Sequence, residues 1–350
     1  MSIRTASLAF LCALALAGAP VAHADRVVTD SAGRQVTVPD RIERVFAAGP
    51  PASILLYILA PDRMIGWPRA PHPEELPYIA PEYRDLPEVG WLTGRGDTVN
   101  LEVLLQSEPD LIFDFGSVRE TYVSLAERVQ AQTGIPYILI DGTFANTAAA
   151  VRLLGEVLGV EERAEQIAAY VESTLARIDA TLAEVPQDQR PRVYLARGPS
   201  GLETGLQGSI NTEIIERVGA VNVAVDPSGV RRGIVQVPIE QVVVWNPDTV
   251  ITWDPNFYQT VWKDFYWQSV DAVASGRVYL SPTAPFGWID RPPSLNRMIG
   301  LEWLAGLFYP DHVNQDLREV TRAFYDLFYH VDLTDAELDR LLQWAKGRAP

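Results

Sequence analysis

Arginine and tryptophan residues gather in the segments that follow the predicted strands, and these segments hold four of the nine tryptophans. Arginine binds carboxylate, phosphate and oxyanion groups through paired hydrogen bonds, and aromatic faces suit a bulky organic ligand or a cation. In open α/β sheets, ligands bind at the carboxyl ends of the strands. The residues that we expect to line such a ligand-binding cleft are Pro51, Trp67, Arg69, Trp91, Arg95, Asp114, Arg197, Ser209, Arg231, Trp253, Phe286 and Trp288.

The sequence lacks the patterns that common enzymes use. No two of its four histidines have metal-ligand spacing, and neither a G-x-S-x-G elbow nor a G-x-x-x-x-G-K-[ST] loop is present. Asp114, Asp141 and Asp254 follow predicted strands and could serve an exported hydrolase as paired carboxylates. Aspartate at such positions more often turns the chain or caps the next helix. We therefore favour ligand binding and keep the hydrolase as the alternative.

The N-terminus has the pattern of a cleaved export signal. An apolar run at 8–19 ends before an A-x-A cleavage site at Ala24, so we expect residues 1–24 to be a signal peptide. In a Gram-negative bacterium this signal implies a periplasmic location. The only cysteine, Cys12, lies within it, so the mature chain has no disulfide and no thiolate ligand.

The rest of the composition is that of a large acidic protein. The chain has 350 residues and a net charge of −16, which argues against nucleic acid or an anionic membrane as a partner. With 47% hydrophobic residues, it is long enough for two domain-sized cores. Beyond the export signal, we find no apolar run long enough for a transmembrane helix.

Residues 161–184 predict one long helix near the middle of the chain. Its apolar residues recur at intervals of three or four and form a single stripe. These residues are Ile167, Val171, Leu175, Ile178 and Leu182. Pro186 ends the pattern. At about 1.5 Å per residue the helix spans roughly 36 Å, about the width of a small domain.

On both sides of this helix, predicted strands alternate with predicted helices. This order is typical of α/β lobes with a mainly parallel central sheet flanked by helices. We expect an N-terminal lobe at 25–145, a linking helical segment at 146–186 and a C-terminal lobe at 187–350. One of the N-lobe helices is expected at 54–59, with Ser53 as its N-cap.

One short pattern recurs on both sides of the long helix. Glu102 stands seven residues before Pro109-Asp110, and Glu240 stands seven residues before Pro247-Asp248. In both copies we expect a short helix, a turn and a strand, and the copies are 138 residues apart. The pattern indicates two lobes built alike. Coincidence is the alternative, because short motifs recur by chance.

Together these features resemble the periplasmic binding proteins of ABC importers for iron–siderophore, haem and vitamin B12, a class with one long helix between two lobes. The segments that carry the resemblance are 27–36, 100–112, 238–248 and 287–294. The resemblance implies a monomeric receptor that is not an enzyme, has no cofactor of its own and delivers its ligand to permease subunits in the inner membrane. It also implies that Glu102 and Glu240 dock on that permease.

The resemblance leaves the ligand open. A metal chelate of the iron–siderophore, haem or corrinoid type fits the tryptophan-rich cleft and is the expected ligand, which would itself contain iron or cobalt. A molybdate- or tungstate-type oxyanion, which would use the arginines, is the alternative. We do not expect a bare Zn²⁺ or Mn²⁺ ion, because His72 is the only histidine among the N-lobe loops.

Overall fold

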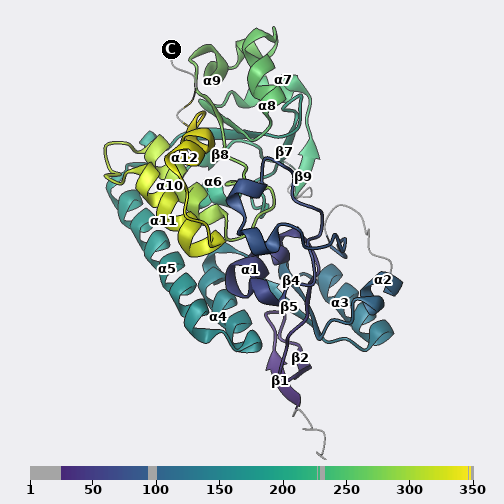
Figure 1. The fold of residues 1–350 in the computed structure, drawn as a ribbon. Coiled ribbons are helices and arrows are strands. Elements are labelled where there is room, and N and C mark those ends of the chain that lie inside the picture. Colours follow the sequence, from purple (N-terminus) through teal and green to yellow (C-terminus); the bar gives the residue numbers. More distant parts are fainter. Residues whose placement is uncertain (1–24, 94–100, 227, 229–232, 346, 348–350) are drawn as a thin grey trace, which may run out of the picture.

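Two parallel β-sheets form the centres of two lobes (Figure 1). The computed structural model describes residues 25–93, 101–226, 228, 233–345 and 347, so the export signal predicted at 1–24 lies outside the described residues. The N-lobe sheet has the order β3 (Val45–Ala47), β4 (Leu111–Gly116), β5 (Tyr137–Asp141). The C-lobe sheet has the order β11 (Val278–Leu280), β10 (Thr249–Thr252), β6 (Arg192–Ala196), β8 (Val221–Asn222). All neighbours in both sheets run parallel, which confirms the predicted α/β fold.

Two antiparallel pairs accompany these sheets. The first is an N-terminal hairpin formed by β1 (Asp25–Thr29) and β2 (Gln35–Pro39). Its turn is fixed to the N-lobe sheet, because the Asp30 carboxylate accepts hydrogen bonds from Arg34 Nε at 2.9 Å and from the backbone amide of Leu139 at 3.0 Å. The second pair, which the sequence did not predict, is formed by β7 (Glu203–Gly205) and β9 (Ile234–Gln236).

Helices cover the sheets of both lobes. Those of the N-lobe and the linking segment are α1 (Pro50–Leu59), α2 (Leu101–Gln106), α3 (Glu120–Thr133), α4 (Thr147–Leu158) and α5 (Glu161–Glu184). Those of the C-terminal part are α6 (Glu213–Arg217), α7 (Ile239–Trp245), α8 (Pro255–Thr260), α9 (Asp271–Ala274), α10 (Arg297–Phe308), α11 (Leu317–Tyr329) and α12 (Asp335–Leu342).

Helix α1 begins earlier than the sequence predicted. Pro50 and Pro51 occupy its first positions, where a proline's fixed φ suits a helix and its missing amide is not needed. The expectation that Ser53 caps this helix is therefore wrong. Ser53 lies inside the first turn, and its hydroxyl donates to the Pro50 carbonyl at 2.8 Å.

Helix α5 has the predicted bounds and is the longest helix of the molecule's described part. Ile167, Val171 and Ile178 of the predicted stripe are fully buried, while Leu175 and Leu182 are partly buried against the same core. Figure 1 shows α5 along the outer edge of the molecule, beside α4 and below α10. One stiff element thus spans both lobes.

The C-terminal helices complete the core of the N-lobe. Helix α11 packs against α1, and the Tyr57 hydroxyl donates to the Tyr329 carbonyl at 2.6 Å while it accepts from the Ala80 amide at 2.8 Å. The largest hydrophobic cluster includes residues from both sheets and from α10 and α11. The largest core therefore crosses the boundary predicted at 186, while two smaller clusters each lie on one side of it.

The short sequence repeat is also a structural repeat. Helices α2 and α7 are both followed by a residue in the left-handed conformation, Glu108 with φ of 45° and Asn246 with φ of 40°, and this residue directly precedes the proline. The Asp110 carboxylate then accepts the amide of Arg44 at 2.8 Å, and the Asp248 carboxylate accepts the amide of Arg192 at 2.8 Å. The Arg44 side chain also donates to the carbonyl of Ser107, just after α2, at 2.6 Å. The Arg192 side chain likewise donates to the carbonyl of Trp245, the last residue of α7, at 2.7 Å. The two copies thus agree in backbone conformation and hydrogen bonding as well as in sequence.

The close approach of α4 to α5 can be tested with two helical glycines. A Cβ at Gly155 of α4 would lie 2.2 Å from Cβ of Ala164, whereas a Cβ at Gly306 of α10 would meet no atom closer than 4.0 Å. We expect Gly155→Ala to lower the free energy of unfolding by about 1–3 kcal/mol through overpacking. We expect Gly306→Ala to raise it by up to about 1 kcal/mol through helix propensity. Urea denaturation measures both, and equal stability of the two variants would contradict the packing described.

Candidate ligand-binding cavity

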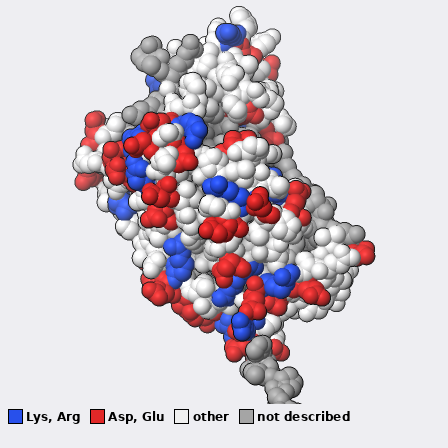
Figure 2. All heavy atoms as spheres, in the orientation of Figure 1, with Lys and Arg blue, Asp and Glu red and all other residues white. Residues whose placement is uncertain are grey.

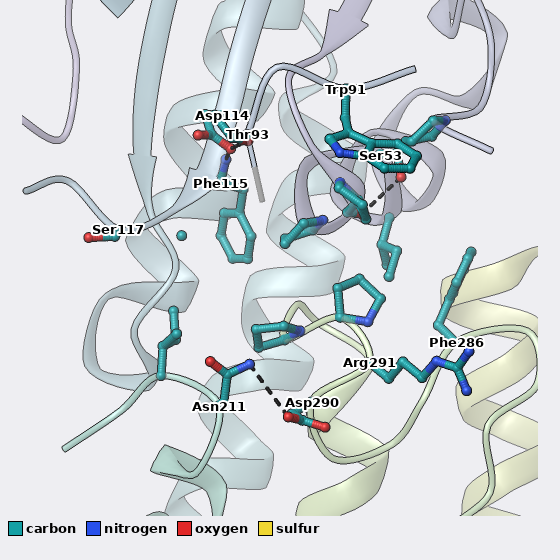
Figure 3. A pocket seen from close by; sticks show the side chains of 18 of the residues that line it. Ser53, Trp91, Thr93, Asp114, Phe115, Ser117, Asn211, Phe286, Asp290 and Arg291 are labelled. Atoms are coloured by element: carbon teal, nitrogen blue, oxygen red, sulfur yellow. Dashed lines mark hydrogen bonds between the residues drawn. The ribbon is translucent and has the colours of Figure 1, made fainter. Parts of the chain in front are cut away.

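A cavity of about 1060 Å³ lies between the lobes and is lined by residues of both. The N-lobe contributes the start of α1 and the loop after β4, and the C-lobe contributes the segments before α6 and α10. Figure 3 shows side chains from these segments facing a common space. The predicted cleft residues found on its wall are Pro51, Trp67, Arg69, Trp91, Asp114, Arg197, Ser209 and Phe286.

Four of the predicted cleft residues are not placed on this wall. Arg95 and Arg231 lie outside the described residues. Trp288 is fully buried, with its ring edge-on to Trp303, so the expectation that it lines the cavity is corrected. Trp253 lies behind the wall, beneath the guanidinium of Arg291, whose central carbon is 4.6 Å from the ring centroid.

Two of the predicted arginines are engaged by carboxylates of their own lobe. Arg69 forms a paired contact with Glu75, at 2.6 and 2.8 Å. Arg197 forms ion pairs with Glu203 at 2.8 Å and with Asp290 at 3.0 Å. These partners offset most of the positive charge, so both arginines serve chiefly to hold the loops of the wall in place.

Two arginines that the sequence reasoning missed also line the cavity. Arg119, from the N-lobe, and Arg291, from the C-lobe, are exposed, and neither has a carboxylate partner among the residues that the structure describes. Arg119 donates to the hydroxyl of Ser117 at 3.1 Å, and Arg291 stacks on Trp253. Arg291 belongs to the segment at 287–294 that carried the family resemblance, and this segment was the sequence feature that could have indicated Arg291 as a cavity residue.

The loop that carries Arg291 is anchored by buried polar groups. Asp290 is 2% exposed and accepts from the Asn211 amide group at 3.4 Å, in addition to its ion pair with Arg197. Burial raises the pKa of Asp290, against the lowering effect of Arg197. The Asn296 side chain donates to the Pro292 carbonyl at 2.9 Å. These contacts fix the backbone on which Arg291 is presented.

Asp114 is a buried carboxyl group on the N-lobe side of the cavity (Figure 3). One of its oxygens accepts hydrogen bonds from the Thr93 hydroxyl at 3.2 Å and from the Phe115 amide at 2.9 Å. Burial raises its pKa to about 6, because these bonds offset only part of the desolvation of the charged form.

The other two aspartates of the hydrolase alternative have structural roles. Asp141 accepts from the amide of Thr143 at 2.9 Å and from the side chain of Asn146 at 2.7 Å, which shapes the turn after β5. Asp254 caps α8 through the amides of its first turn. Both perform the turn and cap functions that are usual for aspartate.

Behind the cavity, a buried arginine joins the two lobes. Arg297 is 1% exposed, pairs with Glu213 at 3.0 Å and donates to the carbonyls of Ile210 at 3.2 Å and of Gly142, in the N-lobe, at 2.7 Å. Its guanidinium lies 4.1 Å from the ring centroid of Phe144, whose amide donates to the other Glu213 oxygen at 3.0 Å. The pair therefore bridges the lobes at the back of the cavity.

The described part of the chain does not gather its metal-ligating side chains into clusters. It holds no group of three or more His, Cys, Asp or Glu side chains that could bind a metal ion. Its helices include none with the length and apolarity required to cross a membrane. Figure 2 shows acidic and basic side chains interspersed on the face drawn, without the extended basic surface that nucleic acids require.

A family model described as periplasmic binding protein matches residues 55–285. The chain belongs to the periplasmic binding protein family. Proteins of this family are the solute-binding components of ABC importers and are periplasmic or lipoproteins, so the resemblance drawn from the sequence is confirmed.

Individual relatives of this periplasmic binding protein differ in their ligands. The molybdate-binding protein MolA of Haemophilus influenzae is 26% identical over 334 residues, 88% of this chain and 92% of the relative. An ABC transporter solute binding protein from Sulfurospirillum deleyianum is 28% identical, with a TM-score of 0.82 over 91% of this chain and 99% of that one. A haem binding protein of Pseudomonas aeruginosa shares only the fold, at 19% identity and a TM-score of 0.57 over 77% and 93%. All three are named for the binding of a ligand or solute, and none is named for a catalytic activity.

The buried carboxyl group predicts a pH-dependent stability. Burial raises the pKa of Asp114 to about 6, so ionisation of this group lowers stability progressively as the pH rises from about 4 to about 6, and the full penalty is present above that. The penalty is absent near about pH 3, where the group is protonated in both the folded and the unfolded state. We expect Asp114→Asn to raise the free energy of unfolding by about 1–3 kcal/mol at neutral pH and to leave it unchanged near about pH 3. The measurement is denaturant unfolding of the variant and the wild type across this pH range, with the exposed Asp85→Asn as control. A difference in the free energy of unfolding that does not change with pH would contradict the burial of the Asp114 carboxylate.

Proposed function

We propose that this protein is the periplasmic receptor of an ABC importer and that its cavity captures an anionic metal species. The observation that carries the proposal is the pair of arginines without carboxylate partners in the described chain, Arg119 and Arg291, which face the cavity from opposite lobes. The chain is strongly acidic, so exposed positive charge in its cleft is a local exception that favours a negative ligand. A ligand held between these two guanidinium groups would contact both lobes at once.

The size and walls of the cavity favour a bulky metal chelate of the iron–siderophore, haem or corrinoid type. Its volume of about 1060 Å³ is near the upper end of the usual range for small-molecule sites. Trp91 and Phe286 supply aromatic surface on its wall, the buried Trp67 packs against Phe286, and several prolines add rigid apolar surface. In this form of the proposal the metal is part of the ligand, and the protein needs no cofactor of its own.

A bare oxyanion of the molybdate or tungstate type is the second candidate. The relative named as a molybdate-binding protein, which aligns over most of both chains, favours it. The same two arginines would bind the oxyanion, and Ser209 and Asn211 on the C-lobe wall could donate further hydrogen bonds. Because a tetrahedral anion is much smaller than the cavity, this candidate requires the lobes to close around it.

The remaining parts of the proposal follow from the export signal and the repeat. Cleavage after Ala24 would release a monomeric receptor into the periplasm. The receptor would then dock on the permease through Glu102 and Glu240, which are exposed in the first turns of the equivalent helices α2 and α7. Binding and release would involve no covalent change to the ligand.

The proposed ligand class can be tested on the mature protein purified from its own periplasm. We expect native mass spectrometry and elemental analysis to detect one of two species. One is a bound organic molecule together with iron or cobalt, and the other is molybdenum or tungsten with no organic molecule bound. The first result would establish the chelate and the second the oxyanion. We expect Arg119→Gln and Arg291→Gln each to weaken binding of that ligand by about 10–100-fold, because each removes a charge-assisted hydrogen bond. Unchanged affinity in both, with Arg128→Gln as control, would contradict an anionic ligand.

The docking role of the two glutamates can be tested separately from ligand binding. We expect the double variant Glu102→Ala and Glu240→Ala to lose ligand uptake in cells or proteoliposomes and to retain the affinity of the wild type for the ligand, since both residues lie outside the cavity. The control is the double variant of two other exposed glutamates, Glu127→Ala and Glu319→Ala. Normal uptake by the first double variant would show that the permease binds elsewhere.

A further inference from the structure

Asp114 differs from the other buried carboxyl groups of the described chain in what surrounds it. Asp30, Asp290 and Glu302 each form an ion pair with an arginine, and Asp254 caps the first turn of α8. Asp114 is 5% exposed, and no described cation lies within ion-pair distance of it. Among these five carboxyl groups it is therefore the one whose negative charge neither an arginine nor a helix N-terminus balances.

Only one oxygen of the Asp114 carboxyl group has hydrogen-bond partners among the residues that the structure describes. The Thr93 hydroxyl and the Phe115 amide both donate to Oδ1, and no described residue donates to Oδ2. Oδ2 is not one of the fully enclosed polar atoms that lack a partner, and Asp114 lines the cavity. This oxygen is therefore an open acceptor at the cavity wall. An ionised carboxylate only accepts hydrogen bonds, so an N–H, O–H or ammonium group would satisfy it.

The same cavity also offers the complementary chemistry. Arg119 and Arg291 line it with guanidinium groups, which donate to an anionic group. Figure 3 shows Asp114 beside Thr93 in the N-lobe and Arg291 across the space in the C-lobe. A guanidinium close to Asp114 would lower the pKa of its carboxyl group, whereas burial raises it and only the two hydrogen bonds to Oδ1 oppose that rise. Asp114 and the arginines are therefore separate binding positions in one cavity.

We propose that Oδ2 of Asp114 accepts a hydrogen bond from the bound solute, and that the cavity thereby selects organic metal chelates that carry amide, hydroxyl or ammonium groups in addition to an anionic group. This inference rests on the proposed receptor function and narrows its ligand class. Haem with ionised carboxylates and a bare molybdate-type oxyanion both lack such a donor at neutral pH. An ionised Asp114 would in addition repel an oxyanion placed near it.

Selection of a donor explains a carboxyl group that lowers the stability of the empty protein. Asparagine has the shape of aspartate, and its side-chain oxygen would accept the bonds from Thr93 and Phe115 without placing a charge in a buried position. The second oxygen of Asp114 is what asparagine would lack. A donor from the solute would form a charge-assisted hydrogen bond with this oxygen, and such bonds are stronger than those between neutral groups. Stability is thus lower in the empty protein and selectivity is gained on binding.

The test measures the affinity of the mature protein for four probes by calorimetric titration at neutral pH. Cyanocobalamin and ferric aerobactin each carry an anionic group and amide N–H donors, whereas haemin and molybdate carry anionic groups and no N–H donor. The variant is Asp114→Asn, which replaces the open acceptor by an NH₂ donor of the same size. The control is Asp85→Asn, which makes the same change of charge at an exposed residue outside the cavity. Thermal unfolding without any probe is measured for all three proteins.

We expect the wild type to bind at least one donor-bearing probe more tightly than haemin and molybdate. We expect Asp114→Asn to weaken binding of that probe by about 10–100-fold, because a charge-assisted hydrogen bond is replaced by two donors that face each other. Any binding of molybdate should become tighter in the same variant, since a like charge is removed. The variant should bind the donor-bearing probe less tightly although it unfolds at a higher temperature, a combination that loss of structure would not produce. The control should bind as the wild type does.

The other outcomes separate this inference from the function on which it rests. Tight binding of a donor-bearing probe that Asp114→Asn leaves unchanged would overturn the role of Asp114 and leave the receptor function standing. Haemin or molybdate as the tightest probe would overturn the selection of donors and likewise leave the receptor function standing. If the wild type binds none of the four probes, the proposed ligand classes fail, and this inference fails with them.

Discussion

The buried contact between Arg297 and Glu213 is the constraint on which the relation between the lobes depends. A guanidinium removed from water is tolerated only when carboxylates and carbonyls satisfy its donors. Here the partners come from both lobes, because Glu213 and the Gly142 carbonyl both accept from Arg297 and the Phe144 ring covers it. The C-lobe supplies the carboxylate, but the N-lobe supplies the Gly142 carbonyl, so separating the lobes would leave a buried donor of Arg297 unpaired. The pair, together with α5 and the shared hydrophobic core, therefore sets the separation of the cavity walls.

Much of the framework could be predicted because it follows from local periodicity. The stripe on α5 specifies a helix buried on one side, and strands separated by helices specify parallel sheets. The repeat could be recognised in the sequence from two glutamates and two Pro-Asp pairs. These residues form local structure, namely a left-handed residue before the proline and an aspartate that accepts the amide of a strand residue. The cleft at the carboxyl ends of the strands followed from the same topology.

The site itself depends on contacts between residues far apart in sequence, and these could not be predicted. Trp288 resembles a cleft residue locally, but it is buried by helices that follow it. Arg69 and Arg197 looked like free cations until their carboxylate partners were located. Conversely, Arg119 and Arg291 became candidates only when the fold placed both on the cavity wall without such partners in the described chain. Residue type indicated the chemistry, and only the tertiary structure showed which residues could perform it.

The closure of the N-lobe core by α11 has a consequence for the order in which the chain can fold during its biogenesis. Tyr57 forms its hydrogen bond with Tyr329, so α1 cannot complete its packing until nearly the whole chain has been synthesised. A nascent chain that has produced only the N-lobe sheet lacks α11, so the surface of α1 that this helix covers in the native fold stays exposed. Export systems that translocate unfolded polypeptides require a chain that has not yet folded. The topology of this chain would meet that requirement, because its N-lobe completes its packing only after the last helices have crossed the membrane.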